Sequence, residues 1–351
     1  MPARWLNRPL AGPADHAVCR RSIRGGSKTF SAASLFLPKR LRDAAFPLYA
    51  FCRLSDDMVD EEGGSTAAVA HLRERLDRVY RGQPANAAVD RAFADVVARY
   101  GLPRALPEAL IDGLEWDVAG VRCETLSDLY AYATRVAGTV GAMMAVLMGC
   151  HDPEAVARAC DLGIAMQLTN VARDVGEDAR NGRLYLPRSW LWSEGVDPDA
   201  WLARPDWTPA IGAAVERLLA AADELYRRAD SGIGGLPASC RASIFAARHM
   251  YREIGEEVAR RRFDSVSGRA RVSGRRKLKL AGKAVSDALF VRQAKHALPP
   301  LDEAAYLVEA VASARPSILA LSLDQPGRIA SRILWVAELM VALEMREQVS
   351  G

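Results

Sequence analysis

The hydrophobic positions along the chain recur at spacings of three and four residues wherever a pattern is legible, and this is the period of amphipathic helices. Alanine and leucine are abundant, whereas runs of aromatic and β-branched residues are few. The pattern therefore predicts an all-α protein. The expected helices include residues 39–60, 66–100, 126–148, 211–228 and 239–262, with the second broken near residues 82–84.

No linker-like tract divides the 351 residues, so a single large helical domain is expected in spite of the length. Residues 1–14 carry no pattern and are predicted to be a disordered lead. The all-α domain is predicted to span residues 15–285. Residues 286–351 alternate apolar and charged positions helically, which predicts a helical C-terminal extension of unknown role.

A column of oxygen-bearing side chains stands at the centre of the chain. Asn170, Asp174 and Asp178 recur every four residues, and Gln167 precedes Asn170 by one turn on the same helix face. Two carboxylates one turn apart, beside carboxamide oxygens, suit a hard cation such as Mg²⁺, which proteins hold with few carboxylates plus a phosphate ligand. Taken alone, a solvated helix face that carries aspartates explains the column equally well.

A second polar column lies nearer the N-terminus. Tyr49, Arg53, Asp56 or Asp57, and Asp60 recur at three and four residues, and Asp56 with Asp60 forms a pair one turn apart. Two helices that each offer an Asp-x-x-x-Asp face in an apolar context indicate a shared metal site for Mg²⁺ or Mn²⁺. The partner that such a site suits is a diphosphate, bridged to both faces by the metal.

Two further stretches allow two interpretations each. Ser27 and Thr29 are hydroxyl residues beside a lysine that could donate to phosphate oxygens, although a helix N-cap also explains them. Gly138 and Gly141 lie one turn apart, on the same predicted helix as Tyr132, and admit close approach of a ligand or of another helix. The second stretch therefore predicts either the wall of an apolar cavity or plain helix packing.

Residues 260–283 hold ten lysines and arginines against one acidic residue, Asp264. An anionic membrane surface, a nucleic acid, and capture of diphosphate at the mouth of a site are three possible partners. Phe263 is the one aromatic residue in this segment, so aromatic residues do not alternate with the charges, and no nucleic-acid motif is present. Nucleic acid therefore ranks last and no nucleic-acid partner is expected.

Composition and cysteine usage narrow the setting. The net charge of +4 says little about partners, and the six cysteines are scattered without a CxxC pair, which fits reduced thiols in a cytoplasmic protein. No secretory signal is visible, and the longest apolar stretch, residues 137–150, is too short to span a bilayer. A di-iron carboxylate bundle is disfavoured, because no Glu-x-x-His pair occurs.

Together these stretches resemble the squalene/phytoene synthase family, whose members join two prenyl diphosphates head to head. The resemblance spans residues 18–283 in the expected order, and within the family it is closest to the phytoene synthases through residues 183–190 and 271–278. The motifs that carry it are Tyr49-x-x-Cys-Arg-x-x-Asp-Asp-x-x-Asp60, Tyr132-Ala-x-x-Val-Ala-Gly-Thr-Val-Gly141, Gln167-x-x-Asn-Val-x-Arg-Asp-x-x-Glu-Asp178 and Gly182-Arg-Leu-Tyr-Leu-Pro187.

The resemblance implies one isoprenoid-synthase-type helical bundle around a central cavity, with Mg²⁺ on both aspartate faces. The expected catalytic residues are Asp56, Asp60, Asp174, Asp178, Tyr132 and Arg53, and the expected metal ligands are Asp56, Asp60, Asn170, Asp174 and Asp178. The expected substrate-binding residues are Ser27, Thr29, Tyr49, Arg53, Gln167, Asn170, Arg173 and Tyr251.

The implied reaction condenses two C20 geranylgeranyl diphosphates to phytoene through a cyclopropyl diphosphate, as in carotenoid biosynthesis and without NADPH. A physical hint points the same way, since the small Ser34 lies one turn from Phe30 on the expected cavity side and leaves volume for a long tail. We also expect peripheral contact with the inner face of the membrane, where the apolar product is released. The alternatives are squalene or dehydrosqualene synthesis from C15 farnesyl diphosphate, and a non-catalytic helical protein that binds prenyl lipid or membrane.

Overall fold

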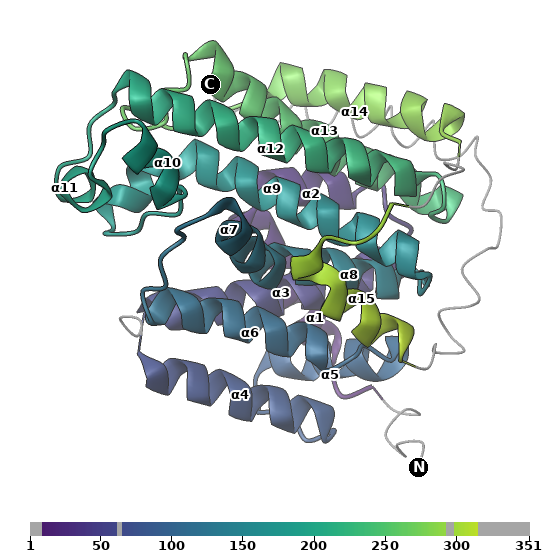
Figure 1. Ribbon diagram of the computed structural model, residues 1–351. Coiled ribbons are helices and arrows are strands. Elements are labelled where there is room, and N and C mark those ends of the chain that lie inside the picture. The colour runs from purple at the N-terminus through teal and green to yellow at the C-terminus, as the bar shows by residue number, and fades with distance from the viewer. Residues whose placement is uncertain (1–8, 62–64, 293–297, 315–351) are drawn as a thin grey trace, which may run out of the picture.

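The structure is a computed structural model that describes residues 9–61, 65–292 and 298–314, without the side chains of Lys28, Asp60 and Glu61. The described residues form helices joined by short loops and contain no strand, which confirms the predicted all-α class (Figure 1). The elements in chain order are α1 (Pro13–Gly26), α2 (Lys28–Ser34), α3 (Lys39–Glu61), α4 (Thr66–Tyr80), α5 (Ala88–Tyr100), α6 (Ala105–Val118), α7 (Leu126–Ala133), η2 (Thr134–Gly138), α8 (Thr139–Leu147), α9 (Pro153–Arg180), α10 (Arg188–Ser193), α11 (Pro198–Ala203), α12 (Pro209–Ile233), α13 (Ala238–Arg260), α14 (Gly274–Phe290), η3 (Asp302–Ala304) and α15 (Ala305–Ala312).

Helix α9 is the central element. It starts at a strong N-cap, where the Asp152 carboxylate accepts a hydrogen bond from the Ala155 N–H at 3.0 Å and Pro153 occupies the first turn. Its 28 residues correspond to about 42 Å of helix. Helices α8, α12 and α13 all pack against it, and α12 and α13 lie over it in Figure 1. The bundle is therefore built around α9.

Helix α12 shows why these segments pack as the periodicity predicts. Its buried apolar residues recur at three and four positions, so one face of the helix is continuous hydrocarbon and lies against α9. The Thr208 hydroxyl caps its N-terminus by accepting from the Ile211 N–H at 3.3 Å. The residues of this stripe are Ile211, Val215, Leu218, Ala222, Leu225 and Ala229.

Two glycines allow the helix that carries residues 126–148 to touch α9 backbone to backbone. A Cβ on Gly141 would lie 2.1 Å from the Ala159 carbonyl oxygen, and a Cβ on Gly163 would lie 2.2 Å from that of Ala137. Any larger residue would separate the helices, so close helix approach is the structural reason for Gly141. This helix also contains a π-helical turn, η2, immediately after Tyr132.

The apolar stretch 137–150 lies mainly in η2 and α8, most of it buried in the core. Among the described residues, no helix is both long enough and apolar enough to cross a membrane.

Both predicted outer boundaries differ from the observed elements. The N–H groups of Leu10 and Ala11 donate to the two Asp95 carboxylate oxygens at 2.9 Å, and α1 begins at Pro13, so the ordered chain begins before residue 15. Helix α14 runs through the predicted boundary at 285 and ends at Phe290. Residues 298–314 then pack back onto the bundle as η3 and α15, while residues 1–8 and 315–351 lie outside the described part.

Candidate active site

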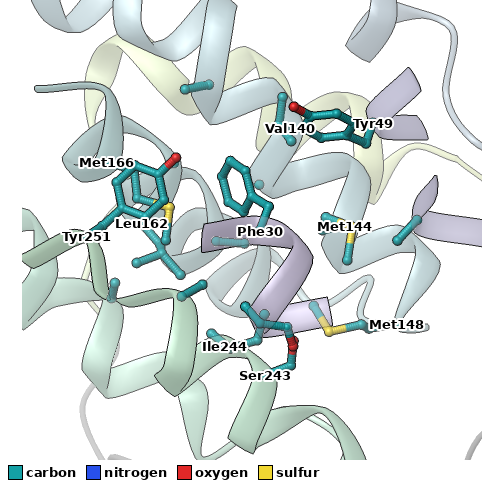
Figure 2. A pocket seen from close by; sticks show the side chains of 18 of the residues that line it. Phe30, Tyr49, Val140, Met144, Met148, Leu162, Met166, Ser243, Ile244 and Tyr251 are labelled. Carbon is teal, nitrogen blue, oxygen red and sulfur yellow. The ribbon is translucent and has the colours of Figure 1, made fainter. Parts of the chain in front are cut away.

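The bundle encloses one space with a polar region and an apolar region. The polar cavity has a volume of about 740 Å³ and is lined from α2, α3, α6, α9, α13 and residues 269–277. The apolar cavity, of about 300 Å³, lies between α2, α3, α8, α9, α12 and α13 (Figure 2). The two cavities adjoin each other, since seven residues line both. The shared residues are Phe30, Tyr49, Cys52, Val136, Gln167, Asn170 and Tyr251.

The polar cavity brings the two predicted columns together. Asp56 on α3 and Asn170 on α9, one from each column, both line it. The side chain of Asp60 lies outside the described part, and Asp174 and Asp178, which follow on α9, are not among the residues that line the cavity. The predicted residues that line this cavity are Ser27, Thr29, Tyr49, Arg53, Asp56, Tyr132, Gln167, Asn170, Arg173 and Tyr251.

Ser27 combines the two roles that its sequence context allows. Its hydroxyl oxygen accepts from the Phe30 N–H at 3.2 Å and so caps α2, as the N-cap interpretation predicts. It also lines the polar cavity together with Thr29. The start of α2 therefore places hydroxyl groups at the edge of the site.

Each aspartate column includes an arginine that is held by a neighbouring carboxylate. Arg53 Nε donates to both oxygens of Asp57, at 2.8 and 2.9 Å, and this bond raises the pKa of the guanidinium. Arg173 donates to Asp174 through Nε at 2.7 Å and Nη2 at 2.5 Å. Arg269, from residues 260–283 (the basic segment), also pairs with Asp174, with 2.8 Å between Nε and Oδ1.

The basic segment thus lies at the mouth of the polar cavity. Arg269, Arg271 and Lys277 all line it. For these three side chains, this position favours capture of an anionic substrate over the other two partners that the sequence allowed. Another charge of the segment is held by a buried carboxylate, since Arg276 pairs with Glu253 at 2.9 Å.

The α9 column has the character of a cation site. Burial raises the pKa of the Asp178 carboxyl to about 7, and the neighbouring Asp174 charge adds to the shift. The Asn170 carbonyl oxygen Oδ1 is buried without a hydrogen-bond partner. A cation would offset both costs, so these residues fit a bound divalent metal. No three His, Cys, Asp or Glu side chains of the described residues cluster closely enough to hold a metal by themselves.

Asp117 on α6 is a site residue that the sequence analysis missed. Its carboxylate accepts hydrogen bonds from the hydroxyls of Tyr132 at 2.9 Å and Tyr185 at 2.7 Å, and the two tyrosine rings stack with centroids 4.9 Å apart. Burial, followed by the Asp117 charge, raises the pKa of both phenols, so both stay protonated as donors. No other carboxylate stands three or four residues from Asp117 in the sequence, so helical spacing does not single it out. Tyr185, in contrast, stands within the quoted loop motif.

Removing the Tyr132 hydroxyl tests this cluster. We expect Tyr132→Phe to lower turnover about tenfold, because a hydrogen bond to a charged group contributes roughly 1.5–3 kcal/mol and Asp117 then keeps only Tyr185 as a tyrosine partner. Tyr80→Phe is the matched control, since its hydroxyl donates to the Leu102 carbonyl at 3.0 Å outside both cavities. Steady-state rates and melting temperatures of both variants are the measurement. Full activity in Tyr132→Phe would leave the ring as mere packing.

An aromatic wall stands where the two cavities meet. The Phe30 ring lies 5.2 Å from that of Tyr251 and 6.3 Å from that of Tyr49, measured between centroids (Figure 2). Burial raises the pKa of Tyr251 to about 12, so its hydroxyl is neutral. Neutral aromatic faces attract cations while excluding water, which suits the passage from a charged head to a hydrocarbon tail.

Beyond this wall the residues that line the cavity are mostly apolar. Figure 2 shows Met144, Met148, Leu162 and Met166 around it, with Ile244 closing another side. Phe30 and Ser34, which the sequence places one turn apart, both line it. The arrangement can bind a molecule with an anionic head and a long apolar tail.

Comparison with known proteins agrees with this geometry. The model of the squalene/phytoene synthase family matches residues 23–276. A phytoene synthase from Cereibacter sphaeroides is 48% identical over 345 residues, covering 94% of this chain and 95% of that protein. A phytoene synthase from Rhodobacter capsulatus is 51% identical over 311 residues, covering 86% and 91% respectively.

Solved structures share the fold. A dehydrosqualene synthase in complex with a ligand has a TM-score of 0.72 at 32% identity, covering 78% of this chain and 96% of its own. A squalene synthase from Alicyclobacillus acidocaldarius has a TM-score of 0.66 at 28% identity, covering 71% and 95%. Both confirm the isoprenoid-synthase-type bundle. With a matching family model over most of its length and relatives at about half identity, the chain belongs to the squalene/phytoene synthase family.

Proposed function

We propose that the protein is a phytoene synthase, a prenyltransferase that joins two geranylgeranyl diphosphates head to head in carotenoid biosynthesis. The observation that carries this proposal is the 48% identity to a phytoene synthase over nearly the whole of both chains. Squalene or dehydrosqualene synthesis from farnesyl diphosphate is the second candidate, since the solved relatives carry those names at 28–32% identity.

The polar cavity binds the diphosphates. Arg53, Arg173, Arg269, Arg271 and Lys277 line it and offset the charge of two substrate heads. The hydroxyls of Ser27 and Thr29 donate to phosphate oxygens at its edge. Because guanidinium groups hold the anion before and after bond cleavage, the leaving diphosphate is stabilised as its charge develops.

The two aspartate faces hold Mg²⁺, or Mn²⁺ in its place. The residues that would hold it are Asp56, Asp60, Asn170, Asp174 and Asp178, together with phosphate oxygens of the substrate. When bound, the metal supplies charge neutralisation for the diphosphate leaving group. Asp174, now paired with Arg173 and Arg269, would exchange those partners for the metal, which frees both guanidinium groups for phosphate.

The reaction passes through carbocations, so the site must shield them from water rather than supply a nucleophile. One allylic diphosphate ionises, and the double bond of the second attacks the resulting cation to form a cyclopropylcarbinyl diphosphate with loss of a proton. This intermediate ionises in turn, rearranges, and loses a second proton, so that two diphosphates leave and no hydride is consumed. The faces of Tyr49, Tyr251 and Phe30 lie at the junction where the cations form, and the apolar cavity excludes water.

Product analysis tests the function. Purified protein with C20 diphosphate and Mg²⁺, without NADPH, should release diphosphate and a C40 hydrocarbon in a ratio of two to one. The same incubation with C15 diphosphate, with and without NADPH, is the comparison, and chelation of the metal should stop both. A C30 product from C15 substrate, with no C40 product from C20, would replace the proposal by the second candidate. Binding of prenyl diphosphate without any product would replace it by a non-catalytic lipid-binding protein.

We further propose that the protein works in the cytoplasm against the inner face of the membrane, into which its hydrocarbon product passes. Helix α14 supports this, since Leu289 and Phe290 at its end are 59% and 79% exposed. Exposed Arg275, Lys279 and Lys283 lie on the same helix. Apolar side chains beside cationic ones are the combination that binds anionic lipid surfaces.

Vesicle binding checks this placement. The double variant Leu289→Ser, Phe290→Ser should lower the affinity for vesicles that contain anionic lipid about tenfold, because the apolar area available for insertion is lost. Trp192→Ser is the control, since Trp192 is also exposed, at 53%, but lies on α10. Equal binding by wild type and the double variant in a sedimentation assay would exclude this surface.

A further inference from the structure

The apolar cavity ends at a buried charged side chain. Arg158 on α9 lines it and is only 2% exposed. Gln167 and Asn170 on the same helix line both cavities, whereas Arg158 lines the apolar one alone. Twelve residues separate Arg158 from Asn170, which corresponds to about 18 Å along the helix axis. Arg158, together with Ala155 one turn further along α9, therefore lines the end of the cavity away from the diphosphate region.

A network of charges holds this arginine. Its Nε lies 2.9 Å from Oδ2 of Asp161, a carboxylate with no exposed surface. Arg228 on α12 reaches the same oxygen at 3.1 Å. Two guanidinium groups thus share one buried carboxylate, and their other N–H groups need further acceptors.

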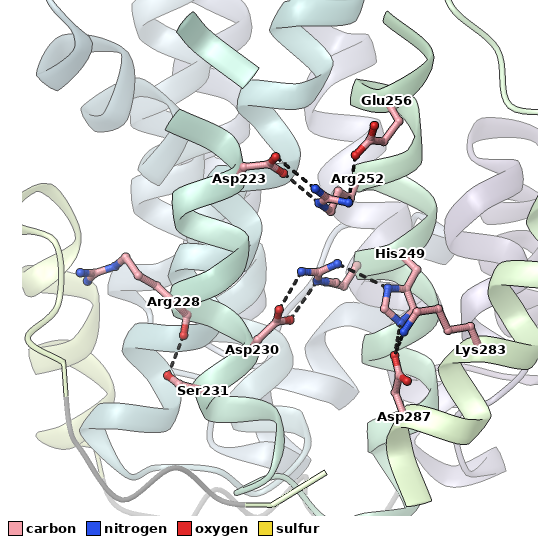
Figure 3. A network of polar contacts seen from close by, with 10 residues as sticks. Asp223, Arg228, Asp230, Ser231, His249, Arg252, Glu256, Lys283 and Asp287 are labelled. Atoms are coloured by element: carbon pink, nitrogen blue, oxygen red, sulfur yellow. Dashed lines mark hydrogen bonds and ion pairs between the residues drawn. The ribbon is translucent and has the colours of Figure 1, made fainter. Parts of the chain in front are cut away.

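Those acceptors are backbone carbonyls of residues 298–314, which we call the strap. Arg158 donates to the carbonyls of Leu298 and Pro299, both at 3.1 Å, and Arg228 donates to that of Pro299 at 2.7 Å. In Figure 3 the Arg228 side chain points toward the strap, away from the polar cluster between α12 and α14. The strap therefore supplies three of the hydrogen bonds of this network, while Arg158 Nε and Asp161 Oδ1 remain buried without a hydrogen-bond partner.

The strap is also docked along the bundle. The Ser127 hydroxyl donates to Glu303 at 2.6 Å, and the Tyr306 ring lies 5.8 Å from the Arg135 guanidinium in the π-helical turn η2. Leu307 and Val311 of α15 are fully buried against the bundle. These contacts fix the position of the two carbonyls that hold Arg158.

Helix α12 leaves just enough room for the arginine stem. A Cβ on Gly232 would lie 2.5 Å from Cβ and 2.6 Å from Cγ of Arg158. The guanidinium is clamped by Asp161 and the strap, so the stem cannot retreat from such a contact. Any displacement would go into the cavity or would separate α12 from α9.

We propose that Arg158, clamped by the strap, is the residue that ends the tail cavity and sets the longest prenyl tail accepted. The proposal rests on the proposed function in taking the tail to be that of a C20 diphosphate. The strap acts through Arg158 and is a positioning element.

Two substitutions move the cavity end in opposite directions. Arg158→Ala removes the stem and leaves Asp161 paired with Arg228, so a C25 diphosphate should gain about tenfold in kcat/KM relative to C20, since hydrocarbon of a few carbons is discriminated by that order. Gly232→Ala pushes the stem inward and should lower kcat/KM for C20 about tenfold relative to C15. A purely structural role would change stability without changing these ratios.

Full-length wild type and variants are compared with C15, C20 and C25 diphosphates, alongside melting temperatures. Arg75→Ala is the control, since Arg75 forms a similar buried pair with Asp90 on the other side of the bundle, outside both cavities. Its ratios should match those of wild type. An unchanged C25 to C20 ratio in folded Arg158→Ala overturns the proposal, and if that variant does not fold, an unchanged C20 to C15 ratio in Gly232→Ala overturns it. If wild type makes product from C15 only, the proposed function fails, and the same test then uses the ratio of C20 to C15 in Arg158→Ala.

Discussion

Asp174→Asn should lower product formation about 10²- to 10³-fold while the protein stays folded, a loss of the size caused by removing one group that stabilises developing charge. Asparagine keeps the size of the side chain but removes the negative charge that a metal ligand supplies. Asp174 is also where Arg173 and Arg269 meet, both of which line the polar cavity. The substitution therefore weakens the metal site and the placement of two phosphate-binding side chains together.

The control for Asp174→Asn must lose an ion pair without touching the site. Asp112→Asn does so, because Asp112 pairs with Arg73 at 2.8 Å on the outer surface of α6. Rates over a Mg²⁺ titration and melting curves of both variants give the measurement, and the control should keep wild-type activity. If Asp174→Asn turned over at near wild-type rate at low Mg²⁺, the α9 column would have no part in metal binding.

Helical spacing in the sequence was enough to anticipate much of the site. Asp56 on α3 and Asn170 on α9 each belong to a column that repeats every turn, and such a repeat can be recognised without any tertiary contact. That residues of both columns line one cavity depends on the tertiary placement of α3 and α9, which local spacing does not contain. The structure supplies this step by placing both residues on the polar cavity.

Asp117 could not be found by the same route. It is one of four carboxylates on α6, and its partners Tyr132 and Tyr185 come from other elements, 15 and 68 residues along the chain. The basic segment illustrates a different limit, since its composition allowed three partners. Only its folded position shows that Arg269 and Lys277 line the cavity while Arg276 is held by Glu253.

The attachment of the strap could not be predicted from the sequence for a different reason. Its attachment to Arg158 and Arg228 uses backbone carbonyls of Leu298 and Pro299, and every residue, proline included, presents the same backbone carbonyl. Sequence pattern shows which side chains can pair, but it does not show which carbonyl a buried guanidinium selects 140 residues away.

The prediction for Ser34 tests the tail cavity from the side of α2. Ser34 lines the apolar cavity and is 6% exposed, and its hydroxyl is already satisfied by the Ser31 carbonyl at 2.8 Å. Its small volume rather than its polarity is therefore what the cavity uses. A phenylalanine here would project into space that the tail of a long substrate occupies.

Ser34→Phe should lower kcat/KM for C20 diphosphate about 100-fold and for C15 by much less, because forcing extra carbons into a filled cavity costs roughly 1–3 kcal/mol. The C15 tail ends sooner and avoids part of this clash. Ser31→Phe is the matched control, since it makes the same change on α2 at a position that lines neither cavity. Rates with both donors and a melting curve for each variant separate substrate selection from stability. Equal losses for C20 and C15 would mean that Ser34 only packs against its neighbours, and the volume beside Phe30 would then play no part in the choice of donor.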